Sequence, residues 1–265
     1  MKPFCLLVIL LTVVSCGKES PSSPAQGDFN GAYPTTLQKL SSSDYDSLLV
    51  VFSQKKGTKY LATLDEFGLL GHVGLLTRGK SSISDANEAI SAAKSALLEL
   101  SDFSNVIDTS SLHVQSARRY TGPMPNVSDW KIWFEKQTYQ GMVVWTDAIL
   151  AIVADDFVLV DGHCYKNIFV PHENNINKER AREIIVGTKI DYYCWFSESF
   201  IVADSSINLD KTEQCIYPLA KDNSIELRVV WKIPICMYPG DPERWYFFVD
   251  VQTGETVGIQ QLFIC

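Results

Sequence analysis

Beyond its first fifteen residues, the sequence has no long apolar run, and no part of it carries an excess of basic charge. Its 23 Lys and Arg residues are outnumbered by 31 Asp and Glu residues, which gives a net charge of −8. Nucleic-acid binding needs a basic surface, so this class of function is disfavoured. No later segment is long and apolar enough to span a bilayer. With 46% apolar residues, the chain can bury one substantial core or two small ones.

The common catalytic signatures are also missing. There is no C-x-x-C spacing, no Gly-x-Ser-x-Gly turn, no P-loop and no Gly-x-Gly-x-x-Gly loop. His172-Glu173 begins the zinc-peptidase pattern, but Ile176 stands where the second His belongs. His163-Cys164 offers at most two ligands, on opposite faces of a strand. We therefore expect no cofactor, no metal and no catalytic residue. The enzymatic alternative that stays open is a thiol peptidase made of a Cys, a His and a carboxylate.

Seven cysteines are present, and their number bears on the redox chemistry of the chain. Cys5 lies in the apolar segment at the N-terminus, and Cys16 follows it directly. Five others remain, which are Cys164, Cys194, Cys215, Cys236 and Cys265. In an oxidising envelope, two disulfides and one unpaired thiol would account for them. The sequence does not fix their pairing, and buried thiols or structural bridges are the expected roles.

The N-terminal segment, residues 1–15, has the anatomy of a secretory signal, with Lys2 before a short apolar run. The residues Val13-Val14-Ser15-Cys16 resemble a bacterial lipobox, in which the Cys sulfur receives diacylglycerol and its amine is then acylated, for example with palmitate. An ordinary signal peptide with an incidental Cys is the alternative. Several acyl chains on Cys16 would give a stable membrane anchor.

The residues after Cys16 bear on the expected location. Gly17 argues against retention in the inner membrane, and Lys18-Glu19 resembles the signal of Bacteroidetes surface lipoproteins. We expect a cell-envelope protein anchored by lipid to the outer membrane, on its periplasmic or surface face. Residues 16–43 are rich in Ser, Pro and small polar residues, which predicts a flexible tether.

A first α+β module is predicted over residues 44–172. Leu48–Phe52 reads as a strand within 44–53, followed by strands over 58–64 and 67–76. A helix is expected from Ser84, as its cap, to about Asp102, because apolar residues recur there at helical spacing. Residues 112–120 form the next predicted strand.

Residues 130–165 form the most informative stretch. Ile132 and Phe134 alternate with Lys131 and Trp133, which predicts a strand with one buried face. Gln140-Gly141 fits a two-residue turn, because Gly tolerates a positive φ. Residues 142–153 are then expected to return as one long apolar strand, and residues 157–165 follow after a turn at 155–156.

This order of elements resembles the propeptides of thermolysin-like and fungalysin-like metallopeptidases, known as the FTP module. The resemblance is carried by the Gln-x-Tyr-x-Gly hairpin and the Gly-x-x-Tyr segment, which are structural motifs of that family. Here they read Gln137, Tyr139 and Gly141, then Gly162 and Tyr165.

A second module is predicted over residues 173–265. Asn177 would cap a helix over 178–186, and four strands are expected at 214–219, 227–236, 245–251 and 256–263. The last hairpin, which contains Asp250 and Gly254, resembles the PepSY module of the same propeptides. Residues 190–212 have no counterpart and read as an aromatic insertion. The expected fold is thus α+β, with two small antiparallel sheets, each packed against a helix.

The resemblance implies a non-catalytic function. No peptidase domain follows the two modules in this sequence, so the chain is expected to act in trans. It would bind a secreted zinc metallopeptidase, and inhibit it or assist its folding, as a peptidase inhibitor or folding aid. The segment after Thr256 or an exposed sheet edge is the expected docking surface. The alternative is an envelope structural or ligand-binding lipoprotein, in which residues 192–196 would form an apolar patch.

Overall fold

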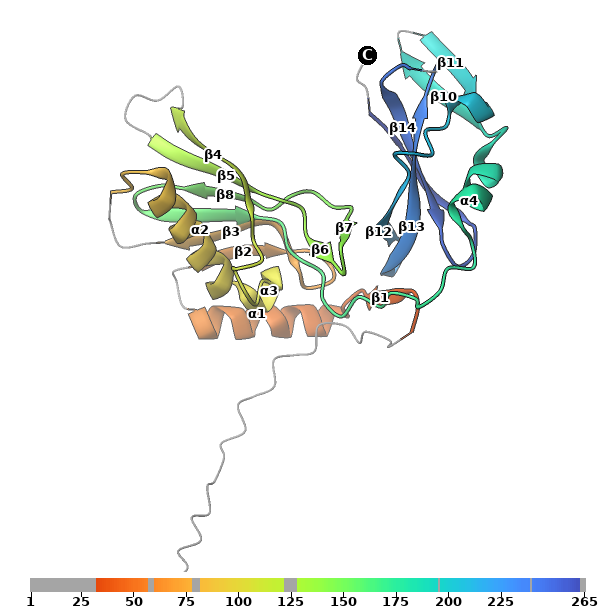
Figure 1. Ribbon diagram of the computed structural model, residues 1–265. Coiled ribbons are helices and arrows are strands. Elements are labelled where there is room, and N and C mark those ends of the chain that lie inside the picture. The colour runs from red at the N-terminus through yellow and green to blue at the C-terminus, as the bar shows by residue number, and fades with distance from the viewer. Residues whose placement is uncertain are drawn as a thin grey trace, which may run out of the picture.

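The chain folds into two lobes that each combine a mainly antiparallel β-sheet with one or more helices, as the computed structural model shows in Figure 1. The structure describes residues 32–56, 60–77, 82–121, 128–194, 196–238 and 240–262. The helices are α1 (Ser42–Lys56), α2 (Ala86–Glu99), α3 (Ser101–Ser104) and α4 (Lys178–Ile185), with a 3₁₀ turn η2 (Asp204–Ser206). The α+β class expected from the sequence is confirmed.

The strands follow the chain through both lobes. Those before residue 173 are β1 (Thr35–Gln38), β2 (Tyr60–Leu64), β3 (Leu70–Thr77), β4 (Val114–Thr121), β5 (Ser128–Phe134), β6 (Thr138–Tyr139), β7 (Met142–Val144), β8 (Leu150–Val153) and β9 (Phe157–Asp161). Those after it are β10 (Lys189–Cys194), β11 (Phe196–Ile201), β12 (Glu213–Ala220), β13 (Ser224–Cys236), β14 (Glu243–Asp250) and β15 (Thr256–Gln261).

The first lobe is a six-stranded antiparallel sheet in the order β2-β3-β9-β8-β5-β4. Its strands alternate in burial: Ile132 and Phe134 on β5 are fully buried, while Lys131 and Trp133 between them are half-buried. The helix α2 packs its small residues, including Ala89 and Ala93, onto the buried face. The predicted alternation on this strand is therefore confirmed.

The N-cap of helix α2 lies one residue later than predicted. Asp85, rather than Ser84, is the N-cap, and its carboxylate accepts hydrogen bonds from the amides of Asn87 at 2.8 Å and Glu88 at 3.0 Å. Ser84 instead donates its backbone N–H to the Glu88 carboxylate at 2.8 Å. An Asp at this position also suits the positive end of the helix dipole.

The strand predicted over residues 44–53 is wrong, because this segment forms helix α1. The Ser41 hydroxyl accepts a hydrogen bond from the Asp44 amide at 3.2 Å, which caps the first turn. Tyr45, Leu48 and Leu49 lie on one helical face and pack against the core of the first lobe. Burial at this spacing stabilises the helix even though β-branched residues follow.

The second lobe contains a seven-stranded sheet with the path β15-β14-β13-β12-β7-β6, while β1 pairs separately with β13. One face is covered by α4, whose predicted cap is confirmed: the Asn177 side chain accepts from the Arg180 amide at 2.8 Å. The β10–β11 hairpin, within the predicted insertion, covers the same face. Its Tyr192 is buried with its ring 5.4 Å from that of Trp245, so this side chain belongs to the core.

The two lobes share strands at their junction. The predicted long strand over 142–153 is interrupted, because β7 joins the sheet of the second lobe while β8 stays in the first. Residues 35–38, inside the segment predicted to be a tether, form β1 against β13. Around these strands lies a junction core made of Leu37, Phe67, Leu69, Val144, Tyr165, Ile168, Ile216, Leu227, Val229 and Val251.

Three of the five cysteines considered for disulfides are free thiols. Cys215 and Cys236 are buried and Cys164 is half-buried, and none of these three is bonded to another cysteine. The expectation of two disulfides among the five is therefore wrong, because only Cys194 and Cys265 are left to pair. The side chain of Cys194, the whole of Cys265 and the lipid-site candidate Cys16 lie outside the described residues. No helix in the described part of the chain has the length and apolar character needed to cross a bilayer.

Candidate functional site: a pocket and a groove between the lobes

A pocket of about 330 Å³ lies where the first lobe meets the junction, and we call it the junction pocket. Four segments line it: the loop after α3, the stretch from β5 to β6, the loop after β7 and the stretch after β9. Its lining includes Asn105, Asp108, Ser111, Glu135, Lys136, Gln137, Tyr139, Thr146, Asp147, Ile149, His163, Cys164, Tyr165 and Lys166. A volume of this size suits a small ligand or a few side chains.

The stretch after β9 is held in place by hydrogen bonds to its backbone from two directions. The Gln137 side chain donates to the Tyr165 carbonyl at 2.6 Å and accepts from the Tyr165 amide at 2.8 Å. On the other side, the Cys164 amide donates to the Ser104 carbonyl at 2.7 Å, and the Asn105 amide group donates to the Cys164 carbonyl at 2.9 Å. The single side chain of Gln137 thus satisfies both backbone groups of Tyr165, as a neighbouring strand would.

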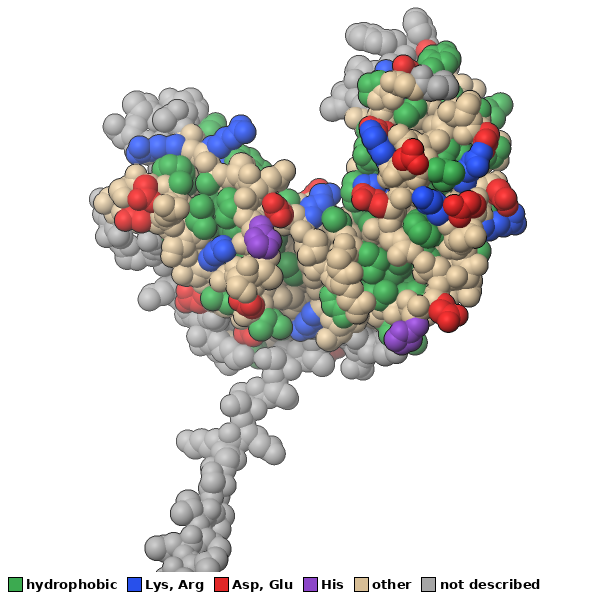
Figure 2. Space-filling model, viewed as in Figure 1, with side chains coloured by type: hydrophobic (Ala, Val, Ile, Leu, Met, Phe, Trp, Pro, Cys, Tyr) green, Lys and Arg blue, Asp and Glu red, His purple; other side chains and the backbone are tan. Residues whose placement is uncertain are grey.

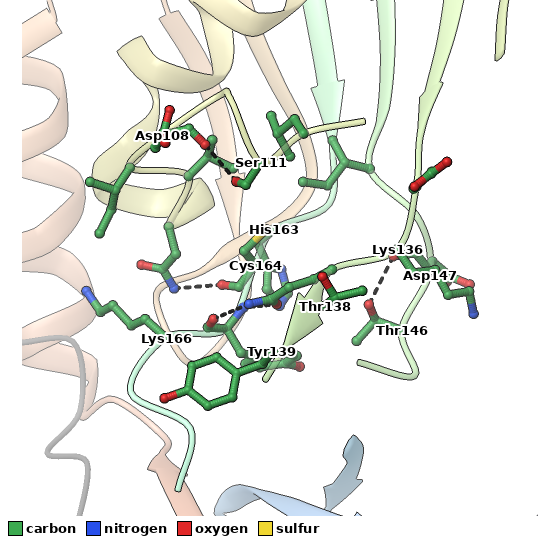
Figure 3. Close-up of a pocket in the computed structure, with 18 of the residues that line it drawn as sticks. Asp108, Ser111, Lys136, Thr138, Tyr139, Thr146, Asp147, His163, Cys164 and Lys166 are labelled. Carbon is green, nitrogen blue, oxygen red and sulfur yellow. Dashed lines mark hydrogen bonds between the residues drawn. The ribbon is translucent and has the colours of Figure 1, made fainter. Parts of the chain in front are cut away.

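The pocket combines an apolar floor with charges of both signs. Ile149 is buried in the floor. Figure 3 shows Lys136, Thr146 and Asp147 on one side and Asp108 and Lys166 on the other, with His163 and Cys164 between them. Desolvation by burial lowers the pKa of both lysines, Lys136 and Lys166. Such an arrangement can hold a ligand that carries both an anionic and a cationic group.

A second depression, of about 480 Å³, lies between the two lobes, and we call it the interlobe groove. Figure 2 shows the broad hollow that separates the lobes. The groove is lined by Lys136, Trp145, Thr146, Asp147, Tyr217, Pro218, Ile259, Gln260 and Gln261. Three residues, Lys136, Thr146 and Asp147, line both the groove and the junction pocket, so the two sites share a rim.

The Trp145 ring lies across the sheet of the second lobe at the groove. Its indole N–H donates to the Gln260 side-chain oxygen on β15 at 2.8 Å, although Trp145 itself follows β7. The ring meets Tyr246 edge-on at 5.5 Å. The amines of Lys136 and Lys232 lie 4.3 Å and 4.5 Å from its ring centre, within the range of cation–π contacts.

Tyr217 lies across the same face of the sheet. Its ring stacks on Phe248 at 4.5 Å, and its hydroxyl reaches β15. A Cβ atom on Gly258 would lie 2.7 Å from this hydroxyl oxygen, so only glycine leaves room for it. Trp145 and Tyr217 thus form an aromatic floor that joins β7 and β12 to β15.

Comparisons with known proteins add little to this geometry. No protein-family model matches the chain, and no curated protein matches it. Among solved structures, the chain is similar to the C-terminal domain of YpeB from Bacillus megaterium, with 13% sequence identity and a TM-score of 0.32. This match covers 86% of the chain and 100% of that domain. A likeness this weak carries no conclusion about the function.

The structure brings five of the motif residues together near the junction. Gln137, Tyr139 and Tyr165 line the junction pocket. Gly141 occupies the predicted two-residue turn with φ +80°, beside Gln140 with φ +49°. Gly162 has φ +102°, and a Cβ there would lie 3.3 Å from the backbone of Ile149.

The other two motif residues, Asp250 and Gly254, lie at the turn between β14 and β15. Asp250 is fully buried; its carboxylate accepts from the Tyr33 hydroxyl at 2.8 Å and from Arg228 at 3.2 Å. It also accepts from the amides of Gln252 and Thr253 in the turn. Burial and the bond to Asp250 raise the pKa of Tyr33. This network stabilises the turn and ties the start of the described chain to the second lobe.

Two of the residues considered for catalysis, His163 and Cys164, line the junction pocket. Burial raises the pKa of the Cys164 thiol to about 11, so it is protonated at neutral pH. The Nδ1 atom of His163 lies 2.9 Å from the Leu70 carbonyl, which can only accept, so the proton is on Nδ1. His172 is exposed in the linker before α4. Within the described ranges, no three His, Cys, Asp or Glu side chains are grouped to hold a metal ion.

Sequence reasoning missed the residues of the groove floor. Trp145, Tyr217 and Lys136 carry no motif, and they meet only because β7 pairs in parallel with β12, Val143 facing Cys215. One signal was present in β14, where Trp245, Tyr246, Phe247 and Phe248 place aromatic rings on both faces of one strand. A strand of this kind indicates a sheet whose two faces are both covered.

Proposed function

We propose that this chain is a non-catalytic binding module of the cell envelope, which holds a segment of a secreted zinc metallopeptidase between its lobes and inhibits it or assists its folding. The observation that supports this most is the interlobe groove, whose floor is the aromatic pair Trp145 and Tyr217. Aromatic residues are enriched at protein-binding surfaces, where they bury a large area at a low cost in conformational entropy.

The groove suits a polypeptide better than a compact small molecule. It is open to solvent, as the hollow in Figure 2 shows, and it is bordered by the outer strand β15. The side-chain amide of Gln260 lies beside the aromatic floor and bonds Trp145. Recognition of an extended peptide commonly combines a strand edge with apolar subsites for side chains.

The choice of a metallopeptidase rests on the resemblance to the propeptides. The Gln-x-Tyr-x-Gly and Gly-x-x-Tyr motifs lie side by side, and Gln137 binds the backbone of Tyr165 directly. The envelope location rests on the lipobox at Cys16. Catalysis by the chain itself is disfavoured, because burial keeps the Cys164 and Cys215 thiols protonated.

A capture experiment tests this proposal. The full chain, with an affinity tag, would be isolated from detergent-solubilised envelopes, and the recovered proteins would be quantified by mass spectrometry. We expect a zinc metallopeptidase in stoichiometric amount, whose peptidase activity falls when the purified chain is added or whose refolding yield rises. Recovery without any metallopeptidase would contradict the proposal.

Two tryptophan variants make the capture specific to the groove. Trp145→Ala removes one of the two rings of the aromatic floor, and we expect it to lose most of the captured peptidase. Trp133→Ala is the matched control, because Trp133 is also half-buried but lies on β5 of the first lobe. Equal capture by the two variants would show that the groove is not the binding surface.

A second candidate function is ligand binding by the junction pocket. Its apolar floor and its charges of both signs favour a small zwitterionic molecule, with no peptidase partner. Native mass spectrometry of the purified chain would detect a co-purifying ligand as a discrete mass increase. Loss of that mass in Lys166→Ala would place the ligand in the junction pocket, because Lys166 lines this pocket and not the groove.

A further inference from the structure

Strand β15 is the outer strand of the seven-stranded sheet. Its inner side pairs with β14, and in the described part of the chain no strand pairs with its outer side. An outer strand presents a row of backbone donors and acceptors that can pair with another extended chain.

The register identifies which backbone groups face outward. The Leu262 amide donates to the Arg244 carbonyl at 2.8 Å, so this pair is of the hydrogen-bonded kind. Along an antiparallel ladder, hydrogen-bonded pairs alternate with pairs that are not hydrogen-bonded, and residues of the second kind point their backbone N–H and C=O away from the partner strand. Gln260 therefore points its backbone groups at β14, while Ile259 points its own outward.

This edge lacks the features that usually block pairing. Residues 256–261 contain no charged residue and no proline. By contrast, β4, the outer strand of the first lobe, exposes the side chains of Arg118 and Arg119. Edge strands are commonly protected by such charges. The exposed side chain of Ile259 adds an apolar contact for an incoming strand, since 45% of its surface is open to solvent.

The outer strand is also a border of the groove. Ile259, Gln260 and Gln261 line it, and Gln260 accepts the hydrogen bond from Trp145. A segment paired with β15 would run along this border, and alternate side chains would point toward the aromatic floor.

Charge indicates what such a segment should carry. Two amines contact the Trp145 ring, and one of them, Lys232, forms an ion pair with Glu213. The other, Lys136, has no ion pair among the described residues; Asp147 is the acidic residue that influences it most strongly, from the rim. Burial also makes its charge less well solvated. A carboxylate brought into the groove would therefore be favoured over an amine.

We propose that β15 and the interlobe groove bind an extended segment of the partner polypeptide, which adds a strand to the sheet and places an acidic side chain at Lys136. This inference rests on the proposed function and specifies how the partner is recognised. A second copy of the chain is a poorer occupant, because pairing edge to edge would use one six-residue strand. A stable interface commonly uses about 20–30 residues on each side.

A synthetic peptide tests the inference directly. The probe is a ten-residue peptide of alternating Thr and Val with two central Glu residues, and its binding to the detergent-solubilised full chain is measured by calorimetry. We expect the same peptide with Lys in place of Glu to bind at least tenfold more weakly. Lys136→Ala should remove this preference. Lys131→Ala is the matched control, because its amine also lies over a ring, Tyr120, but its strand β5 belongs to the other sheet.

Backbone pairing is tested by removing outward donors on either partner. Ile259→Pro removes one outward N–H and no bond to β14, a position where edge strands tolerate proline. We expect it to weaken peptide binding at least tenfold, with an unchanged circular dichroism spectrum. N-methylation of alternate residues of the peptide, in the frame that faces β15, should have the same effect on the unaltered chain. The inference would be overturned if both N-methylated peptides, each methylated on a different set of alternate residues, bound as well as the unmethylated peptide. It would also be overturned if the Glu peptide did not bind.

The outcome separates this inference from the proposed function. Capture of a metallopeptidase that is equal for the unaltered chain and Ile259→Pro would overturn the inference and leave the proposed function standing. Peptide binding that depends on Lys136 and Ile259, without any captured metallopeptidase, would support the edge site and contradict the proposed partner.

Discussion

At the scale of single residues, Gln137 is the side chain that does most to fix the junction pocket. Its two hydrogen bonds satisfy both backbone groups of Tyr165, a residue that is itself buried. We expect Gln137→Ala to lower the free energy of unfolding by about 2–6 kcal/mol, because it leaves two groups unpaired and each costs about 1–3 kcal/mol. Urea titration followed by circular dichroism measures the loss.

The control for this prediction is Gln115→Ala on β4. Gln115 is exposed, so its truncation should change the free energy of unfolding by less than about 0.5 kcal/mol. A comparable loss in the two variants would mean that the bonds to Tyr165 add nothing to stability.

The free thiols give a second prediction at this scale. Burial raises the pKa of Cys164 to about 11 and that of Cys215 to about 12, and only the thiolate reacts with iodoacetamide. We expect both thiols to stay unlabelled in the folded chain at pH 8 and to be labelled within minutes in urea. Site-resolved mass spectrometry measures this. Rapid labelling of Cys164 in the folded chain would instead restore the thiol-peptidase alternative.

The raised pKa values of Cys164 and Cys215 make the free energy of unfolding depend on pH in the alkaline range. A folded pKa above the unfolded value of about 8.5 means that the folded chain holds protons that the unfolded chain releases. The contribution is complete below the unfolded pKa and is lost as the pH rises through the folded pKa. We expect the free energy of unfolding to fall between about pH 9 and 11, and less steeply in Cys164→Ala. An equal slope in that variant would contradict the shift of Cys164.

At the scale of elements, the contact between β12 and β15 depends on Gly258. A Cβ on this residue would meet the Tyr217 hydroxyl oxygen at 2.7 Å and the ring carbon beside it at 2.9 Å. We expect Gly258→Ala to cost about 1–3 kcal/mol, the range of overpacking substitutions. In a Tyr217→Leu background the same change should cost far less, and thermal unfolding of all four chains measures the coupling. If the losses of unfolding free energy from the two single changes simply add in the double variant, the Tyr217 ring moves aside without cost and the contact does not depend on Gly258.

Elements with a local signal could be predicted from the sequence. The α4 helix has its cap at Asn177, the β6–β7 turn has its glycine at Gly141, and β5 alternates between buried and half-buried residues. Helix α1 was missed because a run of Leu and Val suits a strand as well as a helix. Its capping pair, Ser41 and Asp44, was the signal that could have identified it.

Elements that depend on distant partners could not be predicted. Strand β1 reads as part of a polar tether, yet it pairs with β13, and Tyr33 bonds the Val229 carbonyl 196 residues away. The aromatic floor of the groove depends in the same way on the parallel pairing of β7 with β12. Local patterns carry no information about such pairings, so the motif residues of the pocket were found and the groove was not.

At the scale of the whole molecule, the junction core determines how the lobes are held around the groove. Leu37 on β1 is fully buried there, among residues of both lobes such as Leu69 and Val229. We expect Leu37→Ala to lower the free energy of unfolding by about 2–5 kcal/mol, as for other buried leucines. It should also loosen β1, so that small-angle X-ray scattering detects a change in the arrangement of the lobes.

Leu97→Ala is the matched control, because Leu97 is equally buried but lies in the core of the first lobe alone. It should cost a similar free energy and leave the scattering profile unchanged. Groove binding should then weaken in Leu37→Ala and persist in Leu97→Ala, since Trp145 and β15 must keep their spacing to hold a segment between them. Identical scattering and identical binding in the two variants would mean that the shared strands, rather than the junction core, hold the lobes in place.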